Sequence, residues 1–179
     1  MTSNRSASTE LTRNRPSRHR RDLLAANKFK NRVIRGSLNL GFTNGAAGTP
    51  IVYDMEGYTD NGTCQTAAKS FMLGWVDQLA VAPAKVAGVY GSSCNSYLNG
   101  LATIARPPKF IWAANWDGNP STSALSCVSG ANWSNHQRLK PYQGDHNDTW
   151  GGATLNIDSN CANGPMAPTG ALSSTSVCN

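Results

Sequence analysis

Residues 49–56 read TPIVYDME and residues 61–80 read NGTCQTAAKSFMLGWVDQLA, and this pair of stretches predicts a β-strand followed by a helix. The first stretch is short, rich in β-type residues and preceded by glycines, which is typical of a strand. In the second, apolar residues recur at helical spacing, and Pro83 fits the end of the helix. We interpret this stripe as core packing against a sheet. Its members are Ala67, Ala68, Phe71, Met72, Trp75, Val76 and Leu79.

The alternation of strand and helix continues along the chain. We expect a strand at 86–92, a short helix at 96–105 and a strand at 110–115, then a weak strand at 136–143 and a last strand at 153–158. Such alternation predicts a parallel α/β sheet covered by helices. A complete (β/α)8 TIM barrel takes about 200–250 residues. The fold is therefore either an open α/β sheet or a partial, TIM-barrel-like one whose first strands are missing or replaced.

Charge divides the chain into two parts. Residues 1–47 hold ten basic and two acidic residues, a net charge of +8, whereas residues 48–179 hold six basic and eight acidic residues, a net charge of −2. We predict a basic, disordered leader over residues 1–40, a globular domain over 48–165 and a loop-like tail over 166–179. The leader could instead bind nucleic acid, but no aromatic stacking platform accompanies its arginines.

A targeting peptide is a further interpretation of the leader, because Arg20 and Arg21 are adjacent. Lysines and arginines interrupt the apolar run that a signal peptide requires, so no signal peptide is visible. No stretch is long enough to span a membrane.

Five cysteines occur after residue 60, without a C-x-x-C pair or zinc-like histidine spacing, so we expect no structural metal. Scattered among Gly, Asn and Ser residues, they suit disulfides in an oxidising compartment, although buried free thiols in a cytosolic protein are the alternative. Cys94 and Cys127 follow adjacent predicted strands on one face, and we expect them to pair.

Two carboxylates, Asp54 and Glu56, close the first predicted strand. Side chains at i and i+2 share a face, about 6.6 Å apart. In α/β folds the carboxyl ends of the strands carry the site. One protonated and one ionised carboxyl group are what glycoside hydrolysis requires. The alternative is two exposed acids at a strand end.

Other strand ends offer aromatic, amide and carboxylate side chains, which are the groups that bind sugars. Few of them are basic, which argues against phosphate or nucleic acid. Asp145, His146 and Asp148 lack EF-hand spacing, and we expect neither a metal nor another cofactor. The candidate substrate-binding residues are Tyr90, Trp112, Asn115, Trp116, Asp117, His136, Gln137 and Gln143.

Several of these segments also carry a family resemblance. In order along the chain, they resemble a glycoside-hydrolase-like TIM-barrel family of actinobacteria (domain of unknown function 1906), which is similar to the glycoside hydrolase family 25 lysozymes. The segments are IVYDMEGY (51–58), AGVYGSS (87–93), FIWAANWDG (110–118), the HQ and YQ pairs of 136–143, and LNIDSN (155–160).

The resemblance implies a site and a substrate. Glu56 would be the proton donor, Asp54 its partner and Asp158 a further catalytic acid acting on bacterial cell-wall glycan outside the membrane. The first barrel strand of these families, which ends in another Asp, has no counterpart here, so the N-terminus looks truncated.

Three functions remain open at this point. The first is a lysozyme-like hydrolase. The second is a non-catalytic cell-wall carbohydrate-binding module or an inactive truncated relative. The third is a nucleic-acid-associated protein acting through residues 5–35. The oligomeric state is not predicted.

Overall fold

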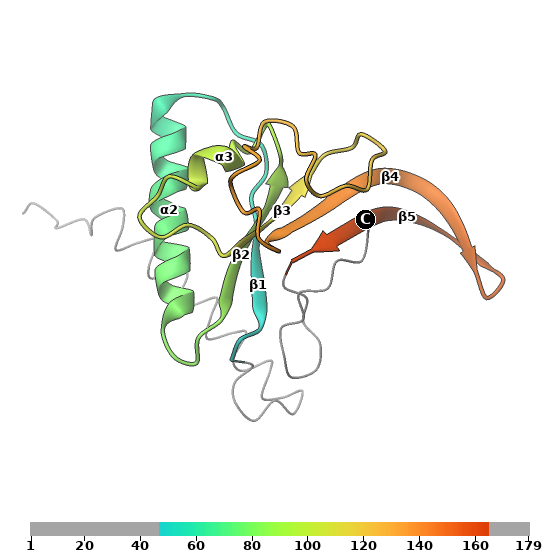
Figure 1. Ribbon diagram of the computed structural model, residues 1–179, viewed down its shortest axis with the longest axis horizontal. Helices are drawn as coiled ribbons and strands as arrows, with labels where there is room; N and C mark the ends of the chain where they lie inside the picture. The colour runs from blue at the N-terminus through green and yellow to red at the C-terminus, as the bar shows by residue number, and fades with distance from the viewer. Residues whose placement is uncertain (1–46, 165–179) are drawn as a thin grey trace, which may run out of the picture.

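The computed structural model describes residues 47–164, in which five strands form one sheet with two helices (Figure 1). The predicted leader and the predicted tail lie outside the described residues. The elements in order are β1 (Pro50–Asp54), α2 (Gly62–Ala80), β2 (Val86–Ser92), α3 (Leu98–Leu101), β3 (Phe110–Ala114), β4 (Arg138–Trp150) and β5 (Ala153–Asn163).

The sheet is mixed, and the prediction of a partial (β/α)8 TIM barrel is wrong. Its strands are ordered β1-β2-β3-β4-β5, with parallel pairing from β1 to β4 and antiparallel pairing of β4 with β5. Within residues 47–164 no helix separates β3 from β4 or β4 from β5. The result is an α/β-like half-barrel rather than repeated βα units.

A two-glycine turn explains the antiparallel pair. Gly151 and Gly152 connect β4 to β5, and both have positive φ angles, 57° and 83°. Two-residue hairpin turns of this kind need positive φ at both positions, which glycine adopts without strain. The stretch from 144 to 150, which lies between the strands predicted at 136–143 and 153–158, is therefore the outer part of β4. Figure 1 shows this hairpin curving away from the body of the molecule.

The predicted helix after β1 is confirmed. Asn61 caps α2, because its side-chain oxygen accepts a 2.8 Å hydrogen bond from the Cys64 N–H. The helix packs on the sheet through the predicted stripe, and Tyr53 of β1 lies 4.6 Å from Phe71 and 5.5 Å from Trp75 between ring centroids. The second helix, α3, is shorter than predicted.

Alternation along the strands gives the sheet two chemically different faces. We call the side that packs on α2 the helix face. It carries the apolar residues Ile51, Tyr53, Ala87, Val89, Ile111 and Ala113. The residues between them point to the opposite side, where the site is found.

A long connection without a helix leads from β3 to β4. The disulfide between Cys94 and Cys127 joins this connection to the segment after β2, as predicted from their positions. The two cysteines are 33 residues apart in the sequence.

Candidate functional site

A cleft of about 430 Å³ lies on the sheet face opposite α2. The strand register builds it, because Asp54 of β1 is aligned with Tyr90 of β2, and Tyr90 with Trp112 of β3. Aligned residues of neighbouring strands share a face, so these three side chains form a row across the sheet. We call this side the cleft face. The residues lining the cleft are Val52, Asp54, Tyr90, Trp112, Trp116, Pro141, Asp158 and Asn160.

Three aromatic side chains line the cleft. Tyr90 and Trp112 meet edge to face, with ring centroids 5.5 Å apart. The Trp112 indole N–H donates a 2.9 Å hydrogen bond to the Asn160 side-chain oxygen, which fixes its orientation. Trp116 is 53% exposed, and a Cβ added at Gly144 would lie 3.2 Å from its ring, so the glycine permits close approach. The exposed ring is thus held beside β4.

Three carboxylates act on Tyr90 of the aromatic row. Burial raises the pKa of Tyr90, and the negative charges of Asp54, Glu56 and Asp158 raise it further. Asp158 also accepts a 3.0 Å hydrogen bond from the Asp145 backbone N–H. Charges act on a side chain mainly at short range in water, so all three predicted catalytic acids are near enough to Tyr90 to affect its pKa. Asp54 and Asp158 line the cleft, whereas Glu56 lies beyond the end of β1.

None of the lysines or arginines among residues 47–164 lines this cleft. The two on β4, Arg138 and Lys140, are buried in the connection between β3 and β4. Arg106 pairs with Asp77 of α2, and Lys69 of α2 donates to Thr103. The cleft is therefore aromatic and acidic.

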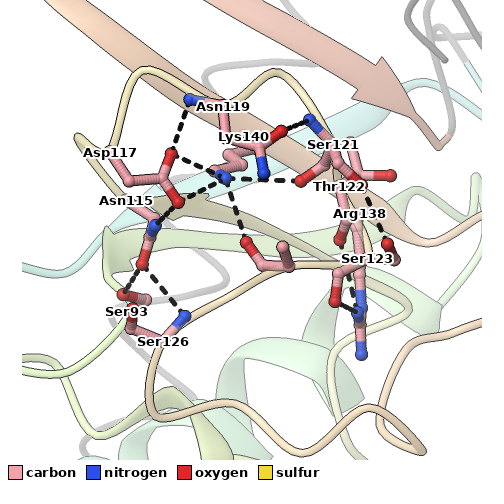
Figure 2. Close-up of polar contacts among 11 residues, drawn as sticks. Ser93, Asn115, Asp117, Asn119, Ser121, Thr122, Ser123, Ser126, Arg138 and Lys140 are labelled. Atoms are coloured by element: carbon pink, nitrogen blue, oxygen red, sulfur yellow. Dashed lines mark hydrogen bonds and ion pairs between the residues drawn. The ribbon is translucent and has the colours of Figure 1, made fainter.

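Lys140 organises one end of that connection (Figure 2). Its fully buried ammonium lies 2.9 Å from an Asp117 carboxylate oxygen and donates to the carbonyls of Ser121 and Ala124 at 3.3 and 2.9 Å. Partial burial opposes ionisation of Asp117. Hydrogen bonds from Lys140 and from the Asn119 N–H, with the Lys140 charge, outweigh this effect and lower the pKa of Asp117.

The same cluster of contacts also holds Asn115, which precedes Trp116 in the sequence as Asp117 follows it. The Asn115 amide group donates to Asp117, and its oxygen accepts from the Ser93 hydroxyl at 3.1 Å and from the Ser126 N–H at 3.0 Å. Both neighbours of Trp116 are thus anchored, and we call these contacts of Lys140, Asp117 and Asn115 the Lys140 clamp (Figure 2).

Arg138 holds the rest of the connection. Its guanidinium donates to five backbone carbonyls, and burial lowers its pKa. The acceptors are the carbonyls of Thr122, Ser123, Ser129, Gly130 and Asn132.

The structure separates the predicted sugar-binding residues into different places. Tyr90, Trp112 and Trp116 line the cleft with the two aspartates, whereas Asn115 and Asp117 belong to the Lys140 clamp. His136 forms a 2.6 Å hydrogen bond with the Asn163 side chain and does not line the cleft. The Gln137 amide donates a 2.7 Å hydrogen bond to the Lys109 carbonyl, and Gln137 lines a separate hollow of about 150 Å³.

Gln143 is exposed on β4, opposite Ser159. Its predicted role, like those of the other candidate residues, stays a prediction.

Sequence reasoning missed Asn160 as a cleft residue. It lies two positions after Asp158 on β5, and strand alternation from Asp158 would have placed it on the same face. Among the described residues no group of three or more His, Cys, Asp or Glu side chains is arranged to hold a metal ion.

Comparison with known families agrees with this chemistry. Residues 38–162 match the family described as "Rv2525c-like, glycoside hydrolase-like domain". The chain belongs to this family. Membership of the Rv2525c-like family supports a glycan-related function and a glycan ligand. The predicted relations to domain of unknown function 1906 and to family 25 lysozymes stay predictions.

Searches of curated proteins and of solved structures found no match to the chain. In the part of the chain that the structure describes, no helix has the length and apolar character to cross a membrane.

Proposed function

We propose that this protein binds a bacterial cell-wall glycan in the cleft. The observation that carries the proposal is the row of Tyr90 and Trp112, flanked by exposed Trp116 and by the carboxylates of Asp54 and Asp158. Aromatic faces pack on the C–H surfaces of sugar rings, and carboxylates and amides bind hydroxyl groups. Clefts with apolar walls and a few polar groups are typical ligand sites.

The charge of the cleft narrows the class of glycan. Its lining residues include two carboxylates and no lysine or arginine. Burying a carboxylate or phosphate of the ligand beside Asp54 and Asp158 would place like charges together without a basic partner, which costs free energy. The proposed ligand is therefore neutral or amino-bearing at the position between these aspartates.

The second candidate function is hydrolysis of that glycan. It is favoured by the carboxylates of Asp54 and Asp158 in the cleft lining and by Glu56, whose charge also acts on Tyr90. Glycoside hydrolysis needs one carboxylic acid and one carboxylate near the bond. In this proposal Glu56 donates the proton to the leaving oxygen, with Asp54 as its partner. Asp158 would stabilise the positive charge that develops on the sugar ring.

One comparison tests both proposals. We would measure binding to purified bacterial cell wall and release of reducing ends, for wild type, Glu56→Gln and the control Asp60→Asn. Asp60 is an exposed acid in the same segment after β1 but outside the cleft. Circular dichroism would first confirm that all three proteins are folded.

We expect all three proteins to bind cell wall. Hydrolysis by the proposed mechanism predicts reducing-end release by wild type and Asp60→Asn, with Glu56→Gln at least about a hundredfold slower. Binding without release would leave the binding module as the function. Absence of binding by the folded wild type would contradict the proposed ligand.

A further inference from the structure

The cleft face extends beyond the cleft, because β5 is continuous from the cleft residues Asn160 and Asp158 back to Ala153. The register irregularities between β4 and β5 place extra residues on β4, so alternation along β5 is regular. Asp158 and Asn160 line the cleft. Asn156 and Thr154, two and four positions before Asp158, therefore lie on the same face of the hairpin.

The facing strand adds side chains of the same kind. Asn147 is paired with Asn156, and Thr149 with Thr154, and directly opposed residues share a face. The Thr149 and Thr154 hydroxyls are 2.9 Å apart, and the Asn156 amide donates to the Asn147 oxygen at 3.4 Å. All four residues are exposed. We call them the polar track.

The other face of the hairpin has a different composition. There Ile157 opposes His146, Leu155 opposes Asp148 and Ala153 opposes Trp150. Leu155 and Trp150 are 51% and 61% exposed. The hairpin is thus amphipathic, with its uncharged hydrogen-bonding groups gathered on the side that continues the cleft.

We propose that the polar track is an extended binding site for a chain-like glycan whose first units occupy the cleft. The inference rests on the proposed function and adds the requirement for a polymer. From Asp158 to Thr154 the track adds about 13 Å along β5, at about 3.3 Å per residue. Amides and hydroxyls both donate and accept hydrogen bonds, which suits the hydroxyl and acetamido groups of successive sugars. Continuity with the cleft favours a glycan chain over another occupant.

Chitooligosaccharides of different length are the probe for this site. We would measure the dissociation constants of a disaccharide and an octasaccharide by isothermal titration calorimetry. The track variant replaces all four residues, as Asn147→Ala, Asn156→Ala, Thr149→Val and Thr154→Val. The control variant carries Asp148→Ala and Leu155→Ala, an opposed pair at the same level of the hairpin but on its other face. Each half of the track variant is also made alone, in case the full variant does not fold.

In wild type the octasaccharide should bind about tenfold more tightly than the disaccharide, the effect of one or two net hydrogen bonds. The track variant should lose this gain and keep the disaccharide affinity, and the control should keep both. Two results would contradict the polar track but not the glycan cleft. In the first, the folded track variant still binds the octasaccharide more tightly than the disaccharide. In the second, wild type binds both with the same affinity. Absence of binding by either probe would overturn the glycan cleft and the track together.

Discussion

The two faces of the β4–β5 hairpin use polar side chains in opposite ways. On the helix face, Arg138 and Lys140 are buried, and their donors are occupied by carbonyls and a carboxylate of the connection from β3. On the cleft face, the polar groups of the hairpin and of Asp158 are exposed. Polar side chains thus hold the connection together where they are buried and their hydrogen bonds are satisfied, and they face solvent where they are exposed.

Removing the buried ammonium group of Lys140 should give the largest loss of stability. Lys140→Met keeps the side-chain volume but removes the buried hydrogen bonds to two carbonyls and the ion pair with Asp117. We expect a loss of about 3 kcal/mol in the free energy of unfolding, measured by urea denaturation. Lys109→Met, an exposed lysine, is the control and should change stability by less than about 0.5 kcal/mol. Equal stability of the two variants would contradict the structural role of Lys140.

Low pH should destabilise the same cluster by a smaller amount, because it protonates Asp117. The folded-state pKa of Asp117 is lowered, so the unfolded chain binds a proton more readily than the folded one. The stabilisation is complete above the ordinary Asp pKa of about 3.9 and is lost as the pH falls through the lowered value. Denaturation between neutral pH and pH about 3 should show less acid sensitivity in Asp117→Asn than in wild type.

How far the sequence predicted the fold depended on burial. Strands β1 to β3 and helix α2 follow apolar patterns set by packing, and the pairing of Cys94 with Cys127 followed from strand order. Residues 153–158 of β5 were predicted as a strand, but the pairing of β5 with β4 was missed because residues 144–150 of β4 are mostly polar and carry no apolar alternation. The adjacent glycines at 151 and 152, between two stretches of suitable length, were the available signal.

The site could be predicted only in part for a related reason. Alternation and strand ends were enough to select Asp54, Tyr90, Trp112 and Asp158, which the register brings to one face. That Asp117 would bond Lys140 could not be predicted, since this contact depends on how a helix-free connection crosses back to β4. Asn115, Trp116 and Asp117 are consecutive, yet only the tryptophan lines the cleft.

Whether the cleft face binds glycan can be decided at its exposed tryptophan, Trp116. We would titrate chitooligosaccharide into wild type, Trp116→Ala and Trp150→Ala by calorimetry, because Trp150 is equally exposed but lies on the other face of the hairpin. We expect about tenfold weaker binding for Trp116→Ala, the order expected when a stacking aromatic is lost, and wild-type binding for Trp150→Ala. Unchanged binding by folded Trp116→Ala, or an equal loss in both variants, would contradict glycan binding by the cleft face.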